Sequence, residues 1–180
     1  MRRVRPFRRT RLAFLVCGIG AAALAALLWF SMSVGDQVIV VKGLSMEPLL
    51  QPGRLLVLDR TAYRTSDGAG PHRGDVVVFR HVEPGYDEYL VKRVIGLPGE
   101  LVRVDTGRVS INGTQLDEPY VRATDDYTYP LGGGSVRVPD GAYFVLGDNR
   151  PVSADSHLGW FVSAADLVGQ ASPLPVVLPA

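Results

Sequence analysis

Three short segments carry side chains that could do chemistry, and the first holds a serine in a tight turn. Lys42–Pro48 reads KGLSMEP, so Ser45 follows a strand-like run that ends at Gly43. A serine at a strand-to-turn junction can present its hydroxyl, and nearby backbone N–H groups can face an oxyanion. Most serines in turns only make local hydrogen bonds, however. The turn alone is weak evidence for a nucleophile, which also needs a base.

The second segment supplies a candidate base, because it contains one of only two lysines in the chain. Lysine can lose its proton when desolvated, whereas arginine cannot do so at neutral pH. Lys92 lies in the run YLVKRVI, where period-two alternation puts it on one strand face with Leu90 and Val94. On a covered face its pKa would have to fall from about 10.4 toward ~7–8 for it to act as a base, and on an open face it would extend into solvent. Lys42 is the rival base, and the alternation does not decide its side.

The third segment, Gly147–Trp160, reads GDNRPVSADSHLGW and follows an apolar strand-like run. Loops that follow strands often carry site residues, although a turn rich in Asx hydrogen bonds would have a similar composition. His157 comes two residues after Asp155, so a Ser-His-Asp site is an alternative, but no nucleophile-elbow motif supports it. The other histidines, His72 and His81, flank a strand-like run in polar contexts and are predicted to face solvent.

The elements that position these side chains are predicted to be β-strands. Two groups of turn residues, Asp105-Thr106-Gly107 and Asn112-Gly113, mark tight turns, and the second is typical of a type I′ hairpin. Only Ser163–Val168 indicates a helix, with Ser163 as its N-cap. The body therefore reads as all-β. The apolar runs that predict its strands span 37–43, 53–60, 74–80, 88–97, 100–105, 108–112, 135–139 and 143–147.

The N-terminus combines a basic head with a long apolar run. Residues 1–11 hold six arginines and no acid, and residues 12–35 carry no charge. As a helix, the run would span roughly 36 Å, enough for the ~30 Å hydrocarbon core of a bilayer. The positive-inside rule then predicts a cytoplasmic head (1–11), a transmembrane signal anchor (12–35) and an extracytoplasmic β-rich domain (36–180). A cleaved signal peptide is the alternative, but its apolar region usually has only about 7–15 residues.

Composition excludes several classes of protein. The formal net charge of +1 hides an acidic body, because 13 basic and 18 acidic residues follow the head. Such a body argues against a nucleic-acid surface. A content of 47% hydrophobic and 21% charged residues argues against disorder. The single cysteine, Cys17, cannot form a disulfide within the chain, and no thiol cluster exists for zinc. We expect no metal and no cofactor.

Taken together, the three segments resemble the motifs of bacterial type I signal peptidases, in order and at comparable spacing. The matching stretches are GLSMEP, RGDVVVF, YLVKRVIGLPGE and GDNRPVSADSHLGW. The resemblance covers the anchor and nearly the whole body, and it is closer to the Gram-positive type. It implies a mainly β fold of packed, twisted antiparallel sheets and a membrane-anchored serine endopeptidase with a Ser/Lys dyad. Its partners would be membrane lipid and the signal peptides of exported preproteins, which are cut at A-x-A-like sites outside the membrane.

The resemblance also implies a role for each matching residue. Ser45 would be the nucleophile and Lys92 the general base, and Ser153 would hydrogen-bond to that lysine and orient it. Asp155 matches an aspartate that usually pairs with an arginine. His157 stands at the position of that arginine. The resulting Asp–His contact would be weaker and pH-dependent, or would be lost.

The residues around the serine have implied roles as well. Gly43 occupies the place where Gram-negative members carry a hydroxyl residue, so the oxyanion hole would rest on backbone N–H groups, including that of Ser45. Leu44 and Met46 would line the substrate pocket or contact the membrane.

Two other functions stay open at this point. One is a related Ser/Lys peptidase dedicated to a secretion or conjugation substrate, which would use the same dyad. The other is a membrane-tethered β-domain that binds partners without catalysis.

Overall fold

The computed structural model describes residues 36–63, 70–121 and 127–174, and the chain divides into two units between residues 36 and 37. The predicted head (1–11) and anchor (12–35) lie outside the described residues. Among the residues that are described, no helix is long and apolar enough to cross a membrane.

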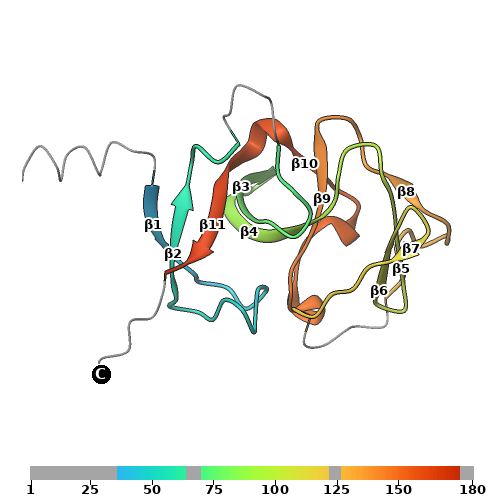
Figure 1. The fold of residues 1–180 in the computed structure, drawn as a ribbon, viewed down its shortest axis with the longest axis horizontal. Helices are drawn as coiled ribbons and strands as arrows, with labels where there is room; N and C mark the ends of the chain where they lie inside the picture. The colour runs from blue at the N-terminus through green and yellow to red at the C-terminus, as the bar shows by residue number, and fades with distance from the viewer. Residues whose placement is uncertain (1–35, 64–69, 122–126, 175–180) are drawn as a thin grey trace, which may run out of the picture. The chain divides into compact units, whose positions relative to one another are not determined.

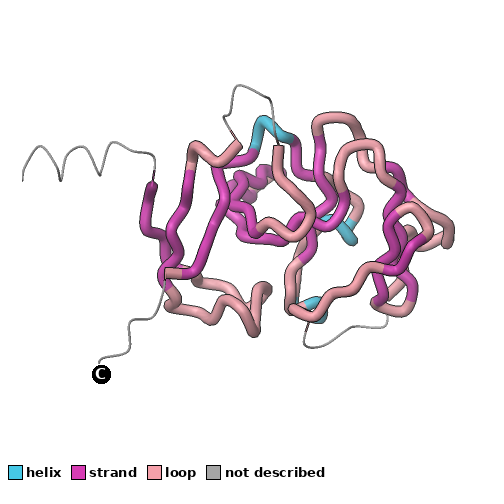
Figure 2. Tube along the Cα trace, in the orientation of Figure 1, coloured by secondary structure: helices cyan, strands magenta, loops and turns pink. Residues whose placement is uncertain are grey.

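The described residues form two β-sheets (Figures 1 and 2). In spatial order, the seven-stranded sheet contains β1 (Asp36–Val40), β2 (Leu55–Asp59), β11 (Leu167–Pro173), β3 (Val76–Glu83), β4 (Tyr86–Gly96), β9 (Ala142–Leu146) and β10 (Val162–Ser163). The four-stranded sheet contains β7 (Thr114–Gln115), β6 (Arg108–Ile111), β5 (Leu101–Asp105) and β8 (Val136–Arg137). The smaller sheet lies at the opposite end of the domain from β2 (Figure 1).

The prediction of a mainly β, antiparallel domain is confirmed. Every strand pair from β2 onward is antiparallel. Both predicted tight turns are present as two-residue hairpin loops, which join β5 to β6 and β6 to β7. Asn112 and Gly113 have φ values of 51° and 83°, and Thr106 and Gly107 have 47° and 74°. Positive φ at both central residues is what a type I′ turn requires.

The apolar faces of these strands form three clusters of buried residues, and the buried part of β4 contributes to two of them. Residues Tyr86–Tyr89 of β4 are exposed, whereas Lys92–Gly96 are buried. Strand β9, which pairs with β4, is buried along its whole length. Val102, Val104 and Phe144 lie in one cluster that joins the two sheets. Lys92 is therefore the first fully buried residue along β4, at the boundary between core and solvent.

The predicted helix at 163–168 is wrong apart from one short turn. Ser163 Oγ accepts a hydrogen bond from the Ala165 N–H at 3.2 Å and caps the 3-10 helix η3 (Ala164–Asp166). The chain then enters β11, a strand that the sequence analysis missed although it lies between β2 and β3. Its sequence, LVGQASP, lacks the alternation of apolar and polar residues that marks a half-buried strand.

Gly169 gives β11 its close approach to β2. A Cβ built at this position would collide with the backbone carbonyl oxygen of Asp59 and lie 2.9 Å from Arg60 Cα. We expect Gly169→Ala to lower the free energy of unfolding by about 1–3 kcal/mol, because the two backbones would have to separate. Urea unfolding of the full chain in detergent measures this loss. Gly132→Ala is the control, since its Cβ would meet nothing within 4 Å; equal effects of both changes would contradict the prediction.

Candidate active site

Ser45 lies in a turn that buried residues hold against the core. The Leu50 N–H donates to the Met46 carbonyl at 2.8 Å, and both side chains are buried in one cluster. Just before the turn, the Val41 carbonyl accepts a hydrogen bond from the Gly53 N–H at 2.8 Å. The turn is therefore anchored on both sides. Ser45 itself is half-buried and lines a cleft.

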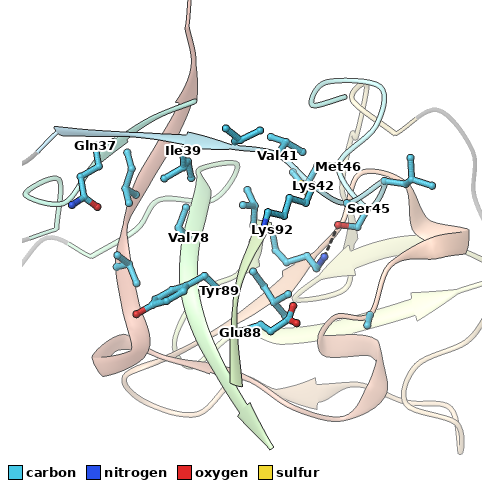
Figure 3. A pocket seen from close by; sticks show the side chains of 18 of the residues that line it. Gln37, Ile39, Val41, Lys42, Ser45, Met46, Val78, Glu88, Tyr89 and Lys92 are labelled. Atoms are coloured by element: carbon cyan, nitrogen blue, oxygen red, sulfur yellow. Dashed lines mark hydrogen bonds between the residues drawn. The ribbon is translucent and has the colours of Figure 1, made fainter. Parts of the chain in front are cut away.

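Lys92 reaches this serine from β4. Strand β4 pairs with β3 on one side and β9 on the other, and Lys92 lies opposite Val77 of β3. The Lys92 side chain extends toward Ser45, and its Nζ lies 2.7 Å from Ser45 Oγ (Figure 3). The two residues are 47 positions apart in the sequence. The fold thus brings together the serine and one of the two lysines that the sequence analysis weighed.

Burial changes the acid–base behaviour of Lys92. The residue is only 3% exposed. Desolvation lowers the pKa of Lys92 from 10.5 to about 8, while the carboxylates of Asp155 and Asp148 favour the charged form and limit the shift. Roughly one lysine in ten would then be neutral at pH 7. A neutral amine in contact with a hydroxyl can accept its proton, and this is the arrangement by which a weak serine nucleophile is activated.

The cleft beside these two residues has a volume of about 960 Å³. Residues of β1 and β4 line it, and so do Ser45 and Lys92. Its lining includes the apolar side chains of Ile39, Val41, Leu58, Val78, Leu90, Val91 and Val168, and its charged members are Lys42, Arg60, Asp87, Glu88 and Lys92. Several of the lining residues are visible in Figure 3. The cleft is large enough for an extended peptide segment.

The loop after β9 brings Asp155 and His157 close to the site, and the contact between them is present. His157 Nδ1 lies 2.7 Å from Asp155 Oδ1. The other carboxylate oxygen of Asp155 accepts a hydrogen bond from the Gly147 N–H at 2.9 Å. Asp155 is fully covered, whereas the His157 side chain is partly exposed and stacks against Tyr127. Of the two outcomes expected for this pair, a contact or its loss, the structure has the contact.

The expected hydrogen bond between Ser153 and Lys92 is absent from the structure. Ser153 Oγ is buried and has no hydrogen-bond partner among the described residues. It lies against the bare Cα of Gly147, which also packs against the Ser45 carbonyl oxygen. The Lys92 ammonium donates to Ser45 Oγ instead. Ser153 is therefore near the site without a hydrogen bond to the lysine.

The residues flanking Ser45 differ in exposure. Gly43 is exposed, and a Cβ built on it would meet nothing within 4 Å. Leu44 is 52% exposed on the cleft, whereas Met46 is 2% exposed and belongs to the core. Of the two roles expected for Met46, its place in the lining of the cleft agrees with a pocket residue, whereas its 2% exposure leaves almost no surface for a membrane contact. Lys42 is exposed and lines the cleft.

One histidine prediction also needs correction. His72 is exposed, as expected. His81 lies within β3, with a side chain only 16% exposed, and its ring stacks on Trp160 at a centroid distance of 4.4 Å. The polar sequence around His81 predicted exposure because it contains no information on Trp160, which lies 79 residues later in the chain.

Sequence reasoning missed two buried ion pairs behind the site. Arg93, next to Lys92, binds Asp148 through Nε at 2.8 Å and Nη2 at 2.6 Å. Arg150 Nη2 binds Glu118 at 2.6 Å, and its Nε donates to the Gly147 carbonyl at 2.9 Å. The sequence does place charged residues inside or beside apolar runs, and this pattern could have indicated buried ion pairs. Their partners could not be read from the sequence because they come from distant segments.

Comparisons with known proteins agree on one family. The family model described as "Signal peptidase, peptidase S26" matches residues 11–174. A probable signal peptidase I-2 from Synechocystis sp. is 44% identical over 131 residues, which are 71% of this chain and 57% of that protein. A signal peptidase I from Leptolyngbya laminosa is 40% identical over 133 residues, covering 71% of this chain and 62% of that protein. The chain thus spans less than two thirds of the length of these two relatives.

A further relative is matched over more of its length. A signal peptidase I from Bacillus caldolyticus is 40% identical over 142 residues, or 73% of this chain and 74% of that protein. A crystal structure of a signal peptidase I from Enterococcus faecalis V583 aligns with a TM-score of 0.48 and 37% identity, covering 57% of this chain and 97% of that one.

Proposed function

Because the chain belongs to the signal peptidase family, peptidase S26, we propose that it is a serine endopeptidase that removes signal peptides from exported preproteins. The observation that carries this proposal is the 2.7 Å contact between Lys92 Nζ and Ser45 Oγ, made by a lysine that is almost fully buried. A binding domain without catalysis would have no need to bury an ammonium group against a serine, because desolvating a charge is costly.

In the proposed mechanism, neutral Lys92 accepts the proton of Ser45 as Oγ attacks the carbonyl carbon of the scissile bond. The negative charge on the carbonyl oxygen is held by backbone N–H groups, including that of Ser45. Lys92 then gives its proton to the leaving amine, and the signal peptide remains as an ester on Oγ. In the second half, Lys92 takes a proton from water, the hydroxide attacks the ester, and the proton returns to Ser45 Oγ.

We propose supporting roles for the loop after β9. The buried hydroxyl of Ser153 lies against Gly147, close to the Ser45 carbonyl, and has no hydrogen-bond partner among the described residues. It would orient Lys92 once the lysine has given up its contact with Ser45. The Asp155–His157 pair would brace the loop, because Asp155 also binds the Gly147 N–H.

The membrane arrangement is part of the proposal. Residues 1–11 would lie in the cytoplasm, residues 12–35 would cross the bilayer, and residues 36–180 would form the catalytic domain outside. A charge-free run of that length after six arginines supports this orientation. The signal peptide would bind in extended form along the cleft, and small shallow pockets next to Ser45 would select the A-x-A pattern.

The pH dependence of cleavage follows from the pKa of Lys92. Only the neutral amine is a base, so kcat/KM should rise with pH through a midpoint near the lysine's pKa of about 8 and level off above about pH 9. Activity at pH 6 should be about a hundredth of the plateau. Initial rates of peptide cleavage between pH 6 and 10, with unfolding checked at each pH, measure the profile. A profile that is flat from pH 6 to 9 would exclude Lys92 as the titrating base.

The test of the proposed substrate class uses the full chain in lipid vesicles and a preprotein with an A-x-A site. We expect one cut after the second alanine, located by product mass. Replacing that alanine with tryptophan in the preprotein should abolish the cut, since a shallow pocket has no room for it. Cleavage of the tryptophan variant at the same rate, or no cleavage of the original preprotein, would overturn the proposed substrate class.

A further inference from the structure

Asn149 makes two hydrogen bonds to the turn that contains Ser45. Its backbone N–H donates to the Ser45 carbonyl at 3.0 Å, and its side-chain Nδ2 donates to the Leu44 carbonyl at 3.0 Å. The second bond joins residues 105 positions apart in the chain. Neither bond was anticipated from the sequence.

The side-chain bond fixes the orientation of one peptide group. In a planar trans peptide the carbonyl and the following N–H point in opposite directions. Because Asn149 Nδ2 binds the Leu44 carbonyl, the N–H of Ser45 must point away from the Asn149 side. The Glu47 N–H also donates to the Leu44 carbonyl, at 3.2 Å, but it comes from the same turn and cannot fix that turn against the rest of the domain.

The Ser45 N–H that this bond orients is available to a substrate. It donates to no acceptor among the described residues. Leu44 and Ser45 line the cleft, whereas Asn149 does not. An N–H that points away from Asn149 is therefore directed to the side on which a scissile carbonyl would lie. Gly43 offers no side-chain donor there, so stabilisation of the oxyanion depends more strongly on the backbone N–H of Ser45.

The position of Asn149 is determined by the strand that also fixes the lysine. Strand β9 pairs with β4, with Leu146 opposite Arg93. The chain then passes Gly147, where a Cβ would lie 2.5 Å from the Ser45 carbonyl oxygen, so only glycine allows this approach. Asp148 is held by Arg93. Asn149 therefore links the strand of Lys92 to the turn of Ser45.

We propose that Asn149 is a positioning residue that orients the Ser45 N–H as an oxyanion donor. This inference rests on the proposed function. Loss of the side-chain bond would leave the backbone bond to the Ser45 carbonyl in place, so the turn would remain but its first peptide group could rotate. We expect loss of this bond to lower kcat, because the oxyanion forms only after the substrate is bound.

The test compares Asn149→Ala, Asn149→Asp and Gln170→Ala in the full chain. Removing an oxyanion donor outright lowers kcat by about 10²–10³, so misorienting one is expected to lower kcat by roughly 10–100-fold with KM within about twofold. Asn149→Asp keeps the side-chain shape but loses the donor, and it should lose at least as much. Gln170→Ala removes another amide-donated bond, to Asp75 at 3.0 Å, between two residues that do not line the cleft, and should leave kcat unchanged.

A transition-state probe separates positioning from a general structural effect. A peptide aldehyde ending in A-x-A should add Ser45 Oγ to its carbonyl carbon, and the resulting hemiacetal oxygen would use the same donor. Its Ki should rise in Asn149→Ala by the factor by which kcat/KM falls, while the pH midpoint stays near that of the wild type. A kcat within twofold of wild type, or a change in KM alone, would overturn the inference and leave the proposed function intact. A wild-type chain that cleaves no preprotein would overturn both.

Discussion

Substituting Lys92 with arginine is expected to lower kcat/KM for preprotein cleavage by about 10⁴-fold or more, comparable to the loss of a triad member in serine proteases. Arginine keeps the positive charge, but its guanidinium cannot be deprotonated at usable pH and so cannot accept the Ser45 proton. The expected loss therefore isolates the basicity of Lys92 from its charge. Raising the pH to 10 should not restore activity in this variant, whereas it activates the wild type. Cleavage rates measured at both pH values give the result.

The other lysine provides the matched control. Lys42→Arg makes the same chemical change three residues before Ser45, at an exposed position on the rim of the cleft. We expect its pH profile to keep the wild-type midpoint, since Ser45 Oγ is hydrogen-bonded by Lys92 and not by Lys42 in the described structure. If Lys42→Arg were inactive and Lys92→Arg active, the base would have been assigned to the wrong lysine.

The second large effect concerns stability. Asp148→Ala is expected to lower the free energy of unfolding by about 3–5 kcal/mol, because it leaves a buried guanidinium without its counterion. Asp148 is fully buried, and the Arg93 side chain is 10% exposed and lies over the Tyr120 ring at 4.1 Å. Asp148 also favours the charged form of Lys92, so its removal should shift the activity midpoint to lower pH. Urea unfolding of the full chain in detergent measures the stability, and the pH profile measures the shift.

An exposed ion pair of the same geometry provides the comparison for Asp148. Arg80 binds Asp87 at 2.8 and 2.6 Å in the β3–β4 hairpin, but both side chains are 53% exposed. Asp87→Ala should therefore cost much less stability than Asp148→Ala, since solvent screens the charges that remain. Similar losses in both variants would mean that burial does not set the strength of the Arg93–Asp148 pair.

The fold could be predicted from the sequence where local signals are strong. Alternating apolar residues and the pair Asn112-Gly113 predicted strands and a hairpin that are present, because period-two patterns and left-handed turn residues act within a few positions. Strand β11 was missed because Gly169 and Pro173 interrupt its pattern. Gly169 is required by contact with the backbone at Asp59, which lies 110 residues earlier in the chain. Local patterns cannot report such a contact.

In the candidate site, too, local patterns could be predicted from the sequence, whereas contacts between distant residues could not. The run around Lys92 placed it on one strand face with Leu90 and Val94 but left open whether that face is covered, and the structure shows that the residue is buried. The choice between Lys92 and Lys42 came only from the resemblance to a family, since neither alternation nor spacing places a side chain across 47 residues. The hydrogen bond from Asn149 to the Leu44 carbonyl, on which its proposed role rests, could not be predicted, because it depends on which way one carbonyl points. The histidine at position 157 was noticed as a departure, but only the structure gives its 2.7 Å contact with Asp155.

The most direct test of the Ser45–Lys92 dyad is product formation by the wild type and by Ser45→Ala. Each full-length chain, in lipid vesicles, is incubated with a preprotein carrying an A-x-A site, and the products are identified by mass. We predict that the wild type releases the mature protein with a single new N-terminus after the second alanine, and that Ser45→Ala releases none above background. Cleavage at the same bond and the same rate by Ser45→Ala would contradict the assignment of Ser45 as the nucleophile.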